Sequence, residues 1–525
     1  MYRLFSFFFL IVFTQACSTV EKPSLGSGAD LTQSAETLAS AIQSGKLTSE
    51  ALVAASLARI EALDKQGPAY QAIISLNENA LTEARQLDAE AAIGQFRGSL
   101  HGLPVLVKDT IETRELPTTA GSLALVANDT GRDAPVVARL RAEGAIILGK
   151  ANLSEWSNFK SSDAPGGWSA LGGQTRNAVN PGHSPCGSSA GSAVALGVFF
   201  APLALGAETS GSITSPAACN GIVGFKPTVG LVSRTRIIPI SSSQDSAGPM
   251  ARTVRDVALL LNVMAGTDPA DSATPDADAR KENYLASIEQ GVSELRIGVF
   301  RWAEGRDERV SAVFNKALKR LEDQGAVLVD IDAFSPDPVM WNSGERLLHI
   351  EFKHGLNAYL ASAADGVPVR SLDELIAFNK ARIDQEPALS DQSIFLEAVG
   401  ASKISDPEYL EMAKAIRRAA GENGIDNLLT THDVSVLVMP STGLPSSLDP
   451  DAAEDARGSP IGASWLSAMA GYPSLSVPSG DYEGLPIGLM ITGTAWDDAL
   501  ILRVGRALER AVAKEQRAKA ASFKR

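Results

Sequence analysis

Apolar and polar residues follow two patterns along most of the chain, and these patterns predict alternating strands and helices. The short apolar runs 102–108 and 145–149 are typical of buried strands. Apolar residues lie near one helical stripe over 47–63, and 135–143 predicts another helix. Thr48 or Ser49 is suited to cap the first of these helices. Strands that alternate with helices indicate an α/β fold.

The second half of the chain continues this alternation, with one interruption. The segments 295–300, 311–324 and 327–331 predict a strand–helix–strand unit, in which Gly325 ends the helix. The segment 336–407 departs from the alternation because its pattern is mainly helical, and we expect it to form a cap over a pocket. Later strands and a closing amphipathic helix are predicted at 434–439, 475–477, 487–491 and 497–519.

The first residues have the pattern of a targeting segment. Arg3 precedes the apolar run 4–13, which is too short to span a membrane and suits a secretory signal. The following Thr-Gln-Ala-Cys, which ends at Cys17, resembles the lipobox of bacterial lipoproteins, although Thr14 stands where Leu is usual. We therefore expect a signal peptide at 1–16, a lipidated Cys17 and a polar tether at 17–35. A plain secretory signal and a wrongly assigned start remain open alternatives.

This interpretation predicts a protein of the bacterial cell envelope, held to the membrane by the lipid on Cys17 or free in the periplasm or outside the cell.

Composition agrees with a globular protein, because 45% of the 525 residues are hydrophobic and 21% are charged. The length allows about three domains or one large α/β domain. The net charge of 47 − 61 = −14 argues against a nucleic-acid partner, which needs a basic face.

Cysteine and histidine usage gives no sign of a metal centre. The three cysteines cannot form a disulfide framework, and the sequence contains neither CxxC nor HExxH. We therefore expect no metal site. Cys186 and Cys219 could pair in an oxidising compartment, but we expect two separate buried thiols.

Two stretches rich in glycine and serine, 184–195 and 206–216, are the strongest chemical signal. Small side chains let the backbone approach a ligand and leave N–H groups free to hold a developing oxyanion. The GxSxG match at 187–191 is not a nucleophile elbow, because the preceding 177–185 is turn material and not a strand. A serine nucleophile then needs another base, and a buried neutral lysine such as Lys108, at the end of a predicted strand, can serve.

Six ordered motifs give the chain a specific resemblance to the amidase signature family, whose members use a Ser–Ser–Lys triad in which one serine has a cis peptide bond. The peptide amidase type is the most similar in appearance. The likeness spans about 45–265 and resumes near 433–507. The motifs are GLPVLVKD (102–109), GKANLSEW (149–156), GGQTRN (172–177), CGSSAGSA (186–193), TSGSITSPA (209–217) and GFKPTVGLVSR (224–234).

The resemblance assigns a role to each matching position. Lys108 resembles the base, Ser212 the nucleophile and Ser188 the bridging cis-serine, since 212 − 188 = 24 is the family's spacing. The backbone N–H groups of Thr209, Ser210, Gly211 and Ser212 resemble the oxyanion loop. There are two departures: many members have Gly at position 210 and Arg at position 214, where this chain has Ser and Thr.

The resemblance also implies the fold and the activity. It predicts one α/β catalytic domain over 36–525, with a single large mixed β-sheet covered by helices on both faces and a variable, partly helical pocket region at 270–430. It predicts hydrolysis of linear carboxamides to carboxylate and ammonia without metal or organic cofactor, with small amides or C-terminal peptide amides as substrates. Two alternatives stay open: an amidotransferase subunit for transfer-RNA-linked amidation, and a binding lipoprotein with a dead site.

Overall fold

The computed structural model describes residues 29–383, 391–449 and 461–522. The expected signal peptide, Cys17 and most of the expected tether therefore lie outside the described residues. No helix in the described part of the chain is long and apolar enough to cross a membrane.

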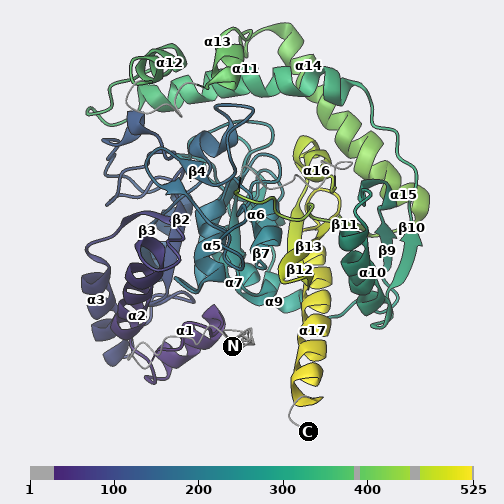
Figure 1. The fold of residues 1–525 in the computed structure, drawn as a ribbon, viewed down its shortest axis with the longest axis horizontal. Coiled ribbons are helices and arrows are strands. Elements are labelled where there is room, and N and C mark those ends of the chain that lie inside the picture. Colours follow the sequence, from purple (N-terminus) through teal and green to yellow (C-terminus); the bar gives the residue numbers. More distant parts are fainter. Residues whose placement is uncertain (1–28, 384–390, 450–460, 523–525) are drawn as a thin grey trace, which may run out of the picture.

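One large mixed sheet forms the centre of the molecule (Figure 1). Its eleven described strands lie in the order β1-β3-β2-β6-β8-β7-β12-β13-β11-β9-β10, and β4 pairs with β5 in a separate small sheet. The strands are β1 (Ile73–Leu76), β2 (Pro104–Lys108), β3 (Ile146–Ala151), β4 (Trp168–Ser169), β5 (Gly173–Gln174), β6 (Leu203–Glu208), β7 (Val223–Lys226), β8 (Ser246–Ala251), β9 (Arg296–Val299), β10 (Val327–Asp330), β11 (Val436–Pro440), β12 (Ser474–Tyr482) and β13 (Leu485–Thr492).

Helices connect these strands and cover both faces of the sheet. Those before residue 336 are α1 (Ala35–Gln43), α2 (Ser49–Ile60), α3 (Ala80–Ala92), α4 (Pro135–Ala142), α5 (Ala190–Gly197), α6 (Thr214–Cys219), α7 (Val254–Met264), α8 (Ala277–Arg280), α9 (Tyr284–Ser287) and α10 (Glu308–Glu322). The others are α11 (Val339–Ala361), α12 (Leu372–Lys380), α13 (Ser393–Val399), α14 (Pro407–Ala420), α15 (Asn427–His432), α16 (Ser464–Ala470) and α17 (Asp498–Ser522).

The mixed sheet with helices on both faces confirms the predicted fold class. Successive strand residues point to opposite faces, so Val105 and Val107 of β2 join one apolar cluster while Leu106 joins another. The predicted strand–helix–strand unit is β9–α10–β10, with the two strands parallel. Of the two predicted capping residues, Thr48 and Ser49, it is Thr48 that caps α2 through its side chain.

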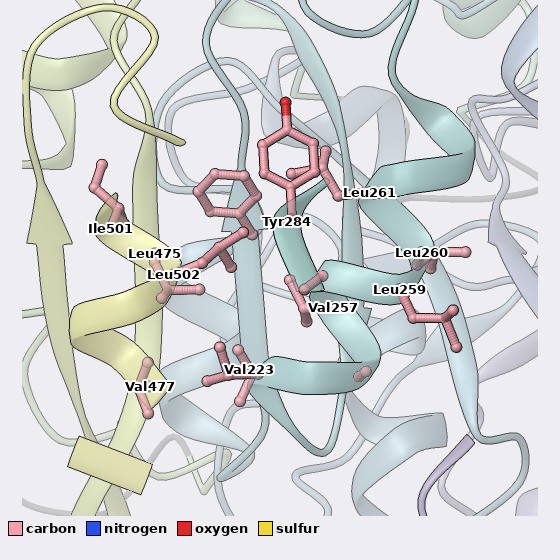
Figure 2. Close-up of a cluster of buried hydrophobic side chains, with 14 of the residues drawn as sticks. Val223, Val257, Leu259, Leu260, Leu261, Tyr284, Leu475, Val477, Ile501 and Leu502 are labelled. Carbon is pink, nitrogen blue, oxygen red and sulfur yellow. The ribbon is translucent and has the colours of Figure 1, made fainter. Parts of the chain in front are cut away.

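The larger apolar cluster ties the two halves of the chain together. Figure 2 shows Ile501 and Leu502 of α17 beside Leu475 of β12, with Val257 of α7 and Val223 of β7 in the same cluster. Residues more than 200 positions apart in sequence thus bury one continuous apolar surface, which is the main favourable contribution to folding.

The segment 336–407 contains α11, α12 and α13. Figure 1 shows these helices, with α14, as a green band along one end of the molecule. Phe352 and Leu356 of α11 and Phe395 of α13 pack on Trp156 and Ile240 in one buried cluster. The band is therefore fixed to the part of the fold that carries the glycine- and serine-rich loops.

Candidate active site

Lys108 is the last residue of β2, which lies between the parallel strands β3 and β6. All five residues of β2 are buried, and the Lys108 side chain is 0% exposed. Its Nζ lies 2.7 Å from Ser188 Oγ and 3.0 Å from the carbonyl oxygen of Ala207. The side chain is therefore aimed into the protein, at one of the two predicted serines.

Burial changes the acid–base behaviour of Lys108. Desolvation penalises the ammonium form and lowers the pKa of Lys108 to about 7, although the carboxylates of Asp245 and Glu208 raise it. With this pKa, roughly half of the amine is neutral at pH 7. The position therefore provides a base at neutral pH.

Ser188 lies in the loop before α5, after a cis peptide bond between Gly187 and Ser188. Its carbonyl oxygen accepts a hydrogen bond from the N–H of Ser154, at 3.1 Å. A Cβ at position 187 would come within 2.4 Å of Ser154 Oγ, so a larger residue there would require the Ser154 side chain to move. The loop is thus held tightly enough to fix Ser188 against Lys108.

Ser212 follows β6 and precedes α6, and it is partly exposed. Its carbonyl oxygen accepts a hydrogen bond of 2.9 Å from the N–H of Ser189, which ties the two serine loops together. Ser188 and Ser212 line the same cavity of about 250 Å³, together with Thr209 and Ser210. The structure thus brings Lys108 to Ser188, and Ser188 to the cavity of Ser212.

The loop 209–212 presents its backbone to this cavity. Within the described chain, the N–H groups of Thr209, Ser210, Gly211 and Ser212 donate no hydrogen bond to another group. Gly211 has φ +81°, a conformation that favours glycine. Free N–H groups beside a serine are the arrangement that stabilises an oxyanion.

Two carboxylates that were not predicted from the sequence, Glu208 and Asp245, hold this loop. Glu208 Oε2 accepts hydrogen bonds from the N–H groups of Ile213 (2.6 Å) and Thr214 (2.9 Å), and from the Thr214 hydroxyl (3.3 Å). Asp245 accepts one from the Thr209 hydroxyl at 2.5 Å, and burial raises the pKa of this carboxyl. Each is the lone acid in a glycine- or serine-rich stretch, which is a signal that the sequence does contain.

The expectation of separate thiols is wrong, because Cys186 and Cys219 form a disulfide. The bond joins the residue before Gly187 to the last residue of α6, the helix that follows Ser212. Spacing along the chain did not indicate this proximity, since it depends on how α6 packs beside the Ser188 loop. The two serine loops are therefore linked covalently as well as by hydrogen bonds.

A second cavity of about 240 Å³ shares Ser157, Thr209 and Ile240 with the first. Apolar side chains line much of it, including Ile237, Ile238 and Pro239. Arg234, which also lines it, forms a two-pronged ion pair with Asp271. Of the variable region 270–430, the residues that line the two cavities are Ala270, Asp271, Ser272 and Leu348.

Comparisons with known proteins agree on one family. A sequence model of the family described as Amidase matches residues 51–502. A probable amidase of Arabidopsis thaliana is 36% identical over 480 residues, which cover 89% of this chain and 87% of that relative. A subunit of the glutamyl-tRNA(Gln) amidotransferase of Anaeromyxobacter sp. (strain K) is 36% identical over 502 residues, with 88% and 93% covered. Among solved structures, the native peptide amidase from Stenotrophomonas maltophilia has a TM-score of 0.86 and 44% identity, with 91% and 96% covered.

Proposed function

The chain belongs to the amidase signature family and is a hydrolase of amide carbon–nitrogen bonds, and we propose that it cleaves linear carboxamides through Lys108, Ser188 and Ser212. The observation that carries this proposal is the buried Lys108 amine, 2.7 Å from Ser188 Oγ, behind the cavity that Ser188 shares with Ser212. No metal or organic cofactor takes part in the proposed reaction.

The first half of the reaction forms an acyl-enzyme. Neutral Lys108 accepts the hydroxyl proton of Ser188, which accepts that of Ser212 as Ser212 Oγ bonds to the carbonyl carbon. The carbonyl oxygen becomes an oxyanion and is stabilised by the N–H groups of residues 209–212. The carbon–nitrogen bond then breaks, while the proton on Lys108 returns through Ser188 to the leaving nitrogen, and ammonia departs.

The second half releases the acid. Water gives a proton to the same relay as it attacks the ester carbon of acylated Ser212. The second tetrahedral intermediate collapses, Ser212 Oγ recovers a proton through Ser188, and the carboxylate product leaves. The 2.7 Å contact between Lys108 and Ser188, and the cavity that Ser188 shares with Ser212, support this relay.

C-terminal peptide amides are the finer substrate class that we propose. Their leaving group is ammonia, so the site needs little room on that side and more on the acyl side. The second cavity, which adjoins that of Ser212 and has Ile237 and Ile238 in its wall, offers that room for a side chain. The likeness to the peptide amidase structure supports the same choice.

The test compares Ser212→Ala with Ser215→Ala, a serine of the same region outside the proposed relay. The readouts are ammonia release from simple carboxamides and peptide amides, and alcohol release from esters. We expect Ser212→Ala to lose at least about 1,000-fold in turnover and Ser215→Ala to stay near the parent rate. An Ser212→Ala variant with parental turnover would refute the relay.

A second candidate follows from the likeness to the amidotransferase of Anaeromyxobacter. An enzyme of that kind would release ammonia from glutamine in preference to peptide amides. Comparing kcat/KM for glutamine and for a peptide amide, on the same preparation, separates the two functions. A catalytically dead binding protein would leave Ser212 unlabelled by a fluorophosphonate probe, whereas we expect labelling at Ser212.

The envelope location also remains a proposal. It rests on the apolar run 4–13 and on Cys17, which lie outside the described residues. Metabolic labelling with a radioactive fatty acid in a bacterial host should mark the parent protein and not Cys17→Ser. Equal labelling of both, or of neither, would contradict lipidation at Cys17.

A further inference from the structure

Three side chains of the helical segment 336–407 converge at a place to which neither the sequence motifs nor the proposed reaction assigns a chemical role. Glu345 and His349 lie one turn apart on α11, and Glu397 lies on α13. Each offers one ligand atom, and these atoms all lie within 4.8 Å of one another. We propose that Glu345, His349 and Glu397 bind a divalent transition-metal ion, with Zn²⁺ the best match.

The imidazole of His349 is the first argument for a ligand. His349 is only 8% exposed, and within the described residues no hydrogen bond reaches either of its ring nitrogens. Its Nε2 lies 3.7 Å from Glu397 Oε2, which is beyond the length of a hydrogen bond. Because no hydrogen bond from the described residues occupies this nitrogen, it is available to a metal ion, for which imidazole is the commonest protein ligand.

The carboxylates are the second argument, because the neighbouring cations of α11 are engaged elsewhere. Lys353 Nζ donates to the carbonyl oxygens of Val399 (2.6 Å) and Ala401 (3.1 Å). Arg346 pairs with Glu408 at 3.0 Å. Glu345 therefore has no ion-pair partner in the described part of the chain, and it faces a second carboxylate. Two negative charges beside an imidazole favour a bound cation.

The ligand atoms, one imidazole nitrogen and two carboxylate oxygens, favour some metal ions over others. Zn²⁺ takes imidazole nitrogen and carboxylate oxygen at about 2.0–2.2 Å, so neighbouring ligand atoms of a tetrahedral site lie roughly 3.4 Å apart. The observed 3.7 Å between His349 and Glu397 needs only a small movement to meet that distance. Mg²⁺ and Ca²⁺ prefer six or more oxygen ligands, so they fit a site with one nitrogen and two carboxylates poorly.

A metal here would join α11 to α13 beside the wall of the catalytic cavity. Leu348, the residue before His349, lines the cavity of Ser188 and Ser212. The His349 ring also lies 5.9 Å from the ring of Phe159, another residue of that wall. The site is thus distinct from the relay but in direct contact with the residues that shape it.

Metal binding to the full-length, EDTA-treated protein tests the proposal without reference to amidase activity. Titration with Zn²⁺ by calorimetry and with Co²⁺ by visible absorption should show one saturable site. Glu345→Gln and Glu397→Gln, at exposed positions, should each weaken binding at least 10-fold, and His349→Gln more. Glu411→Gln is the matched control, since Glu411 lies on α14 in an exposed pair with Lys414 and should leave the affinity unchanged.

Three outcomes would contradict the proposal. Absence of saturable binding would mean that His349 and Glu397 form an ion pair only. Binding that is equally strong in the parent, Glu397→Gln and His349→Gln would place the metal elsewhere. Mg²⁺ and Ca²⁺, titrated in parallel, should compete only at concentrations at least 100-fold higher, and equal competition would contradict the assignment to a transition metal.

Discussion

In the proposed relay the amine of Lys108 acts as a base, and keeping this amine buried has a considerable cost in folding free energy. Lowering its pKa from 10.5 to about 7 corresponds to roughly 5 kcal/mol against the charged form. The hydrogen-bond contacts with Ser188 and Ala207 offset part of this cost. Replacing such a side chain by an apolar one of similar length should therefore raise the free energy of unfolding.

We therefore expect Lys108→Met to be inactive and more stable. Amide turnover should fall at least about 100-fold because the general base is lost. The free energy of unfolding at pH 7 should rise by about 1–3 kcal/mol, less than the full cost because Ser188 loses a partner. The gain should be largest below pH 7 and shrink as the pH rises toward 10.5, where the unfolded lysine also becomes neutral.

Lys226→Met is the matched control for Lys108→Met. Lys226 is also fully buried, with a pKa lowered to about 8 by burial, but its Nζ contacts the carbonyl oxygen of Tyr472 and no serine. It should gain stability and keep amide turnover. Equal losses of turnover in both variants would mean that turnover depends on the structural role of a buried lysine and not on proton transfer by Lys108.

The pH dependence of turnover follows from the same group. Ser188 can pass its proton only to the neutral amine, so kcat/KM should rise with pH through an apparent pKa of about 7. Rates with a neutral peptide amide between pH 5 and 9 measure this dependence. A profile that is flat from pH 6 to 8 would contradict Lys108 as the base, provided that chemistry limits the rate.

Among elements, the two serine loops are joined directly to each other. The Ser189 N–H bonds to the Ser212 carbonyl, and the disulfide joins Cys186 to the end of α6. Glu208 holds the start of α6 from the other side through the N–H groups of Ile213 and Thr214. The loop that carries Ser212 and the loop that carries Ser188 are thus fixed as one unit.

Loss of the disulfide should lower both stability and activity. The closed loop has a sequence separation of 33, for which chain entropy gives a stabilisation of up to about 4 kcal/mol. We expect Cys186→Ser with Cys219→Ser to reduce the free energy of unfolding by about 2–4 kcal/mol, measured in urea. A reducing agent should destabilise the parent similarly and leave the double variant unchanged. A double variant as stable as the parent would show that the link adds nothing to folding.

The sequence predicts local features of this arrangement but not contacts between residues that are distant in sequence. Local patterns predict β2, the β9–α10–β10 unit and the position of Lys108, because strand and helix periodicities are local. The six motifs also identify the family, which the match over 51–502 confirms. The Cys186–Cys219 pair and the approach of Glu397 to His349 could not be predicted, since each requires the packing of elements distant in sequence.

At the scale of the whole molecule, the order of strands in space differs from their order in the chain. The strands β12 and β13 come last in sequence but lie in the middle of the sheet, where β12 pairs with β7. Every residue of the proposed relay comes from the first half of the chain. The sheet that holds those residues is nevertheless completed by the last strands and covered by α17.

A chain that ends at Ala265 should therefore be inactive although it contains Lys108, Ser188 and Ser212. It lacks β12, so the edge of β7 is unpaired, and it lacks α17, so the apolar surface of α7 and β7 is exposed to water. We expect aggregation or rapid proteolysis, no cooperative unfolding by circular dichroism, and no labelling by a fluorophosphonate. A chain that ends at Glu515 keeps the described side-chain contacts of α17 and should retain activity and cooperative unfolding. A stable, active fragment 1–265 would show that the first half folds independently and that the central position of β12 is not required for the site.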